Sequence, residues 1–143
     1  MIRLLDVNVL VALAWPNHIH HARAHAWFKG IRDQGWATCP VTESGFVRVS
    51  SNARVIPDAR TPAEAMALLG EIRRLPGHTF WADDVSPADP GAGPFARIVG
   101  YRQVTDAHLL TLALRNSGSL ATFDRRLAEL APPGQGHAVE LIP

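Results

Sequence analysis

The chain has 143 residues, of which 47% are hydrophobic and 19% charged, with a net charge of +1. These values are typical of one globular domain with its own core. No apolar run approaches the roughly 20 residues of a membrane span, and no basic segment leads into a cleavage site. The single cysteine, Cys39, cannot form an internal disulfide, so we expect a cytoplasmic protein.

Arginine supplies nearly all the strong bases, since Lys29 is the only lysine. Arginine binds phosphate bidentately and stacks on bases, which would suit a nucleic-acid partner. Genomic base composition produces the same bias, and both explanations stay open. The absence of a block of like charges argues against a general electrostatic DNA-binding protein.

The N-terminal segment indicates the fold class. Residues 2–5 are predicted to form a buried strand, and residues 9–14 the start of an apolar helix. This order opens a parallel α/β unit. Asp6 and Asn8 then fall at the carboxyl end of the strand, where such sheets bind ligands. Asp6 alone could equally be a helix cap, so its meaning depends on acids at other strand ends.

The rest of the chain repeats this alternation. The clearest helix start is the capping box Thr61-Pro62-Ala63-Glu64. Thr105 is expected to cap a helix that Gly118 ends. The Gly/Pro-rich residues 87–94 are predicted to form a loop, either mobile beside the site or a plain connection. We predict further helices over 20–31, 43–50, 95–99 and 125–130, and strands over 36–39, 78–81, 120–123 and 138–142.

Histidines gather around the start of the second predicted helix, at positions 18, 20, 21 and 25. The i, i+4 spacing of His21 and His25 could bind zinc. Without acidic or cysteine neighbours, an exposed histidine-rich helix face is the favoured interpretation.

Four carboxylates are predicted to meet at one edge of the sheet. Asp6, Glu43 and Asp124 each follow a predicted strand, and Asp106 lies in the first turn of a helix that precedes one. Like charges gathered in this way repel unless a cation binds between them. Oxygen ligands favour Mg²⁺ or Mn²⁺, which lowers the pKa of bound water and neutralises charge at a phosphoryl centre. The pattern therefore predicts metal-assisted phosphodiester hydrolysis, although Glu43 could merely complement the helix dipole. Arg48, about one turn on, could pair with Glu43 or face phosphate.

The segments around these acids resemble the four acidic motifs of PIN domains, and most closely those of the VapC toxins of bacterial toxin–antitoxin pairs. The motifs are Leu5-Asp6-Val7-Asn8, Thr42-Glu43, Val104-Thr105-Asp106-Ala107-His108 and Thr122-Phe123-Asp124. Two further segments resemble a VapC subgroup abundant in mycobacteria: Phe80-Trp81 with Asp83-Asp84, and Arg102-Gln103 before Val104. The resemblance spans nearly the whole chain, which we interpret as a single domain over residues 1–143.

The resemblance implies a three-layer α/β/α sandwich around a parallel sheet of about five strands. It also implies Mg²⁺-dependent endoribonuclease activity, with Mn²⁺ as a substitute, and neutralisation by a cognate VapB-like antitoxin within homodimers and hetero-oligomers. Carried over, the acids form a metal and catalytic site in which Asp6 and Asp106 are the principal ligands, completed by Glu43 and Asp124. Polar support would come from Asn8, Thr105 and Thr122, and RNA phosphate contacts from Arg48 and Arg102.

Three other functions compete with this hypothesis. A phospho-acceptor receiver needs a lysine near the last strand, and Lys29 lies far too early. A haloacid-dehalogenase-type phosphatase needs a second acid where Asn8 stands. A catalytically silent module that binds an antitoxin and operator DNA is disfavoured by four intact acids. Transfer RNA, ribosomal RNA and messenger RNA would all suit the site as substrates.

Overall fold

The computed structural model describes residues 1–89 and 91–143. Its centre is a five-stranded sheet in the order β3-β2-β1-β4-β5, and all four strand pairings are parallel. With helices on both faces, this confirms the predicted α/β/α sandwich. The strands are β1 (Arg3–Leu5), β2 (Trp36–Thr38), β3 (His78–Phe80), β4 (Ser119–Thr122) and β5 (Val139–Leu141).

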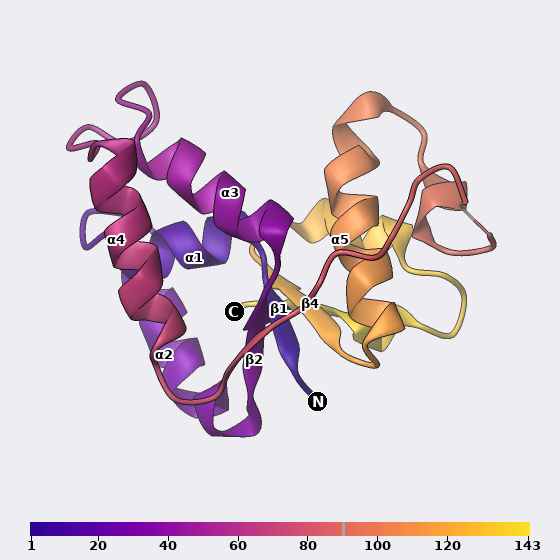
Figure 1. Cartoon of the computed structure of the whole chain (residues 1–143). Coiled ribbons are helices and arrows are strands. Elements are labelled where there is room, and N and C mark those ends of the chain that lie inside the picture. The colour runs from indigo at the N-terminus through magenta and orange to yellow at the C-terminus, as the bar shows by residue number, and fades with distance from the viewer. Residues whose placement is uncertain (90) are drawn as a thin grey trace.

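The helices form two unequal layers (Figure 1). Helices α1 to α4 lie on one side of the sheet and α5 lies on the other. None of the helices in the described part of the chain is long and apolar enough to cross a membrane. The bounds are α1 (Val7–Ala14), α2 (His21–Ile31), α3 (Pro40–Ser50), α4 (Pro62–Arg73) and α5 (Val104–Arg115).

The strand order creates one place where the chain changes direction across the sheet. From β1 it builds outward through β2 to β3, and it then returns to the other side of β1 to add β4 and β5. Connections between parallel strands are right-handed, so this reversal sends α5 to the opposite face from the first four helices. The crevice between the carboxyl ends of β1 and β4 is the topological switch point, where open α/β sheets bind ligands.

The buried side chains divide between the two faces of the sheet. Within β1, Leu4 packs into the cluster under α5, while Leu5 packs into the cluster with α1 and α2. This alternation follows from the period of two along a strand. Both leucines are fully buried, and Cys39 is buried as the expected small core residue.

Helices α1 and α5 start at other residues than the sequence predicts. Helix α1 begins at Val7 and not Val9, because Asp6 caps it by accepting a hydrogen bond from the Val7 N–H. Helix α5 begins at Val104, preceded directly by the 3₁₀ helix η3 (Tyr101–Gln103). The prediction that Thr105 caps α5 is therefore wrong, since this threonine lies exposed inside the first turn.

Other boundaries agree more closely. The Thr61 capping box is confirmed by a 3.2 Å hydrogen bond from the Glu64 N–H to Thr61 Oγ1. The two predicted short helices are 3₁₀ helices, η2 (Pro94–Arg97) and η4 (Arg125–Leu130). Helix α3 starts at Pro40, three residues before Glu43, which still lies in its first turn as expected. The predicted loop over 87–94 includes Pro90, which lies outside the described residues.

The histidine-rich segment has a structural role that its pattern did not indicate. His21 Nδ1 lies 2.8 Å from the Ala12 carbonyl oxygen, and His25 Nε2 lies 2.8 Å from that of Leu13. These carbonyls belong to the last turn of α1, whose acceptors lack helical partners. The interpretation as a wholly exposed face is therefore only partly right: His25 is exposed, whereas His21 is half-buried against α1.

Candidate active site

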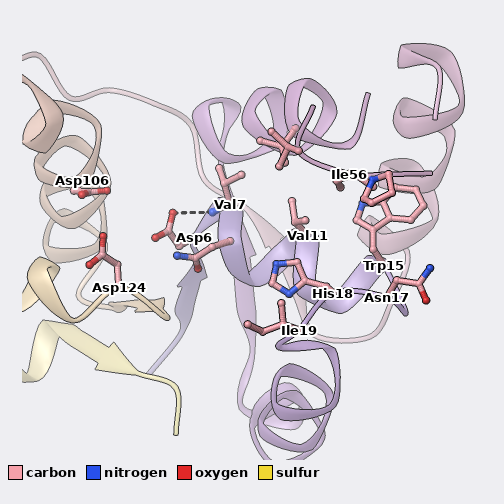
Figure 2. Close-up of a pocket in the computed structure, with 14 residues that line it drawn as sticks. Asp6, Val7, Val11, Trp15, Asn17, His18, Ile19, Ile56, Asp106 and Asp124 are labelled. Atoms are coloured by element: carbon pink, nitrogen blue, oxygen red, sulfur yellow. Dashed lines mark hydrogen bonds between the residues drawn. The ribbon is translucent and has the colours of Figure 1, made fainter. Parts of the chain in front are cut away.

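Three of the four predicted acids line one cavity at the switch point. Asp6 follows β1 as the cap of α1, Asp124 follows β4 as the cap of η4, and Asp106 lies in the first turn of α5. With Asn8 they line one end of a cavity of about 620 Å³. Figure 2 shows the three carboxylates grouped at this end, with Trp15 and Asn17 at the other.

The rest of the cavity wall is largely apolar, and no motif signalled it. It is lined by Trp15 just after α1, by His18 and Ile19, and by Val55 and Ile56 of the loop between α3 and α4. These residues meet only because the fold brings the end of α1 against that loop. The cavity thus combines an anionic end with an aromatic and aliphatic wall.

The Thr122 hydroxyl connects the polar groups of the site. It donates a 2.7 Å hydrogen bond to Asp6 Oδ2. It accepts hydrogen bonds from Asn8 Nδ2 at 3.3 Å and from the Asp124 N–H at 3.0 Å. Thr122 is fully buried, so these bonds fix the ends of β1 and β4 relative to one another. The supporting roles expected for Asn8 and Thr122 agree with this geometry.

Two of the acids bind protons more tightly than usual. Burial raises the pKa of Asp6, against the opposing effect of its hydrogen bonds from Thr122 and Val7. Burial also raises the pKa of Asp106 to about 6, and the negative charges of Asp6 and Asp124 add to the rise. The three carboxylates therefore interact electrostatically although they come from separate elements.

Asp124 has the opposite environment because of Arg126, which the sequence analysis did not identify. The guanidinium donates to both carboxylate oxygens, from Nε to Oδ1 at 3.1 Å and from Nη2 to Oδ2 at 2.9 Å. This pairing is the main reason that the pKa of Asp124 is lowered. A spacing of two residues is the only sequence signal that could have indicated it.

Glu43 lies apart from the other three acids and is not among the described residues that line the cavity. Its carboxylate accepts a 2.6 Å hydrogen bond from Thr38 Oγ1 and pairs with Arg73 Nη1 at 3.4 Å. Thr38 Oγ1 also lies 2.7 Å from His78 Nε2. The structure therefore places Glu43 in a polar group with the last residue of β2 and the first residue of β3.

The remaining predicted residues also lie outside the acidic end. Arg48 and Thr105 are exposed on α3 and α5. Arg102 lines a second cavity of about 190 Å³ together with Asp106 and Arg126. Asp106 thus borders both cavities.

The donor set of the acidic end fits a hard divalent cation. Carboxylates with an amide and a hydroxyl nearby are the ligands that Mg²⁺ and Mn²⁺ prefer. The pKa of Asp106 is raised mainly by burial and in addition by the negative charges of Asp6 and Asp124. Within the described part of the chain, no group of three or more His, Cys, Asp and Glu side chains is arranged to hold a metal ion as it stands. Binding would therefore require side-chain rotation or bridging water, which Mg²⁺ ordinarily retains.

Comparison with known proteins agrees with this fold. The family model of the PIN domain matches residues 3–132, and the chain therefore belongs to the PIN-domain family. Three similar proteins of Mycobacterium tuberculosis are ribonucleases VapC38, VapC39 and VapC44. Identity to VapC38 is 55% over 139 residues (97% of this chain, 96% of the relative). Identity to VapC39 is 52% over 134 residues (94% and 96%), and to VapC44 44% over 131 residues (92% of each). The resemblance to the VapC type is confirmed.

Proposed function

We propose that this protein is a Mg²⁺-dependent endoribonuclease and the toxin of a type II toxin–antitoxin pair. The observation that carries the proposal is the meeting of Asp6, Asp106 and Asp124 at one end of a cavity at the switch point. The proposal of RNA as the substrate is supported by the relatives, which are named ribonucleases. We also propose that the protein acts in the cytoplasm, where it would meet this substrate and the antitoxin.

The chain's own residues would orient the reacting groups. When bound, Mg²⁺ or Mn²⁺ activates water and neutralises charge at the phosphodiester. Asp6 is held ready for this role, because its two oxygens accept hydrogen bonds from Val7 N and Thr122 Oγ1, both at 2.7 Å. Asp106 and Asp124 contribute further oxygens from facing elements. Attack by water, and not by the ribose 2′-hydroxyl, would leave a 5′-phosphate and a 3′-hydroxyl.

The test is cleavage of RNA by the purified protein after removal of divalent ions with EDTA and their stepwise return. We expect cleavage only with Mg²⁺ or Mn²⁺, products that carry a 5′-phosphate, and loss of activity in Asp6→Asn. The control is Asp33→Asn, because Asp33 is an exposed acid that does not line the cavity. Brief expression followed by mapping of cleavage ends in total RNA would name the substrate.

Two results would contradict the proposal. Products ending in a 2′,3′-cyclic phosphate would indicate acid–base catalysis, for which His108 is the first candidate because its Nε2 lies 2.7 Å from Asp83 Oδ1. RNA that stays intact with every divalent ion would favour the catalytically silent module that binds an antitoxin and operator DNA.

We further propose that a VapB-like antitoxin blocks the site by placing a basic side chain, an arginine, among the acids. The proposal is supported by the Asp124–Arg126 pair, in which a guanidinium already binds one of these carboxylates. Affinity for the antitoxin should fall in the Asp6→Asn/Asp106→Asn double variant. Unchanged affinity would move the inhibitory contact elsewhere. The formation of a homodimer by this protein, and of a hetero-oligomer with the antitoxin, stays a prediction.

A further inference from the structure

We propose that Arg126 is an exchangeable partner of Asp124: it binds this carboxylate in the metal-free protein and moves to a backbone phosphate of the RNA when a divalent cation binds. Arg126 would then be a positioning residue for the substrate. The inference rests on the proposed function and adds a phosphate contact to it.

The first support is that Arg126 engages both oxygens of Asp124. The guanidinium takes one oxygen with Nε and the other with Nη2, and the Arg126 backbone N–H adds a 3.0 Å hydrogen bond to Oδ1. A guanidinium bound through two donors occupies the lone pairs of the carboxylate oxygens that a directly bound cation would need. Arg126 and a directly bound cation therefore compete for Asp124.

The second support is that the guanidinium can leave without disturbing the backbone. The Arg126 side chain is 78% exposed, whereas that of Asp124 is 25% exposed. Asp124 caps η4 through the backbone N–H of residue 126, not through the guanidinium. An exposed ion pair of this kind contributes little to stability. Arg126 can therefore exchange Asp124 for another anion at a small cost in free energy.

The third support is the position to which the side chain would move. Arg126 and Arg102 both line the second cavity, and Asp106 borders this cavity and the larger one. Of the acids that line this cavity or pair with Arg126, a cation bound at Asp106 and Asp124 would leave only Glu129 to oppose the two arginines. The second cavity would then attract an anion, and a phosphate next to the reacting one fits it in charge and hydrogen-bonding capacity.

The competition is tested without RNA by titrating Mn²⁺ into the metal-free protein and following its binding by calorimetry. Arg126→Gln should bind Mn²⁺ about two- to fivefold more tightly than wild type. The control is Arg125→Gln, which removes the same charge from the preceding exposed residue. Equal affinities in the two variants would show that Arg126 acts only as a distant charge and would overturn the competition.

The phosphate contact is tested in EDTA, where no turnover is expected, by a double-mutant cycle on binding of a labelled single-stranded RNA. Asp124→Asn releases Arg126 without a metal. Arg126→Gln should therefore weaken RNA binding about two- to fivefold more in the Asp124→Asn background than in wild type. Arg125→Gln should cost the same in both backgrounds.

An equal cost of Arg126→Gln in both backgrounds would overturn the exchange. Thermal melts confirm folding of each variant. Arg126→Lys keeps the charge but cannot donate to both carboxylate oxygens through a guanidinium. Its affinity for Mn²⁺ should therefore lie between those of Arg126→Gln and wild type. Neither readout depends on cleavage, so failure of the exchange is distinct from failure of the ribonuclease proposal.

Discussion

The crevice between β1 and β4 and the end of β2 both carry an acid shortly after a strand, yet their environments differ. In the crevice, burial raises the pKa of both Asp6 and Asp106, and neighbouring carboxylates add to each rise: Asp124 for Asp6, and Asp6 and Asp124 for Asp106. Beside β2, Glu43 has Arg73 as a counter-ion and the Thr38 hydroxyl as a donor. Three acids in the crevice share one paired base, Arg126, whereas Glu43 has a base of its own. An acid after a strand is therefore poised to bind a cation where the sheet brings together more acids than bases.

The largest effect on RNA cleavage is expected when an acid is removed from the crevice. Asp106→Asn removes one metal-binding charge and should lower RNA cleavage by more than about a hundredfold. Initial rates at saturating Mg²⁺ measure the change, with Asp33→Asn as the exposed control. Retention of more than a tenth of the activity would mean that Asp106 is not a ligand.

The next largest effect is expected when the Thr122 hydroxyl, which connects the ends of β1 and β4, is removed. Thr122→Val keeps the shape of the side chain but leaves the Asp124 N–H and Asn8 without their acceptor. We expect a loss of about 1–3 kcal/mol in the free energy of unfolding and of about 10- to 100-fold in activity. Denaturant melts and cleavage rates measure both. Thr122→Ser should restore most of each, and equal defects in the two variants would show that the methyl group, not the hydroxyl, matters.

A smaller loss is expected at the end of β2. Glu43→Gln should lower cleavage by about tenfold, because Glu43 lies outside the cavity and would act through its surroundings. Cleavage rates measured beside those of Asp106→Asn give the comparison directly. A loss as large as that of Asp106→Asn would place Glu43 among the direct ligands and remove the distinction between the two regions.

The smallest expected effect is that of Asp106→Asn on the thermal stability of the metal-free protein. The folded protein raises the pKa of Asp106 from 3.8 to about 6, so it favours the protonated form. The stability gained from that proton is complete below pH 3.8 and is lost as the pH rises through about 6. In EDTA near pH 7.5, Asp106→Asn should therefore melt at or above the wild-type temperature, by no more than about 4 °C. The difference in melting temperature between the two proteins should disappear near pH 4. A melting temperature of Asp106→Asn well below that of wild type at pH 7.5 would show that Asp106 is a structural cap.

Much of this arrangement could be predicted from the chain alone. Alternating buried strands and amphipathic helices indicate a parallel sheet, and a parallel sheet places Asp6 and Asp124 at the same edge. The first-turn position of Asp106 also follows from its pattern. These predictions succeed because each depends on local periodicity and on the common direction of the strands.

The parts that could not be predicted depend on contacts between distant segments. Arg73 reaches Glu43 only because α3 packs against α4. The apolar wall of the cavity depends on a loop whose Val55 and Ile56 carry no motif. Thr105 looked like a cap because its residue type favours that position, but the 3₁₀ turn before it already starts the helix.

The central claim is that the acids of the crevice bind a divalent cation together. Calorimetric titration of Mn²⁺ into wild type, Asp106→Asn and Glu43→Gln, at about pH 7.5 and pH 5, tests it most directly. We expect Asp106→Asn to weaken binding more than about tenfold, and Glu43→Gln to weaken it less. The wild-type affinity should fall at the lower pH, where Asp106, whose pKa is about 6, takes up a proton that the cation must displace. Equal Mn²⁺ affinity in wild type and Asp106→Asn, with no dependence on pH, would contradict the account.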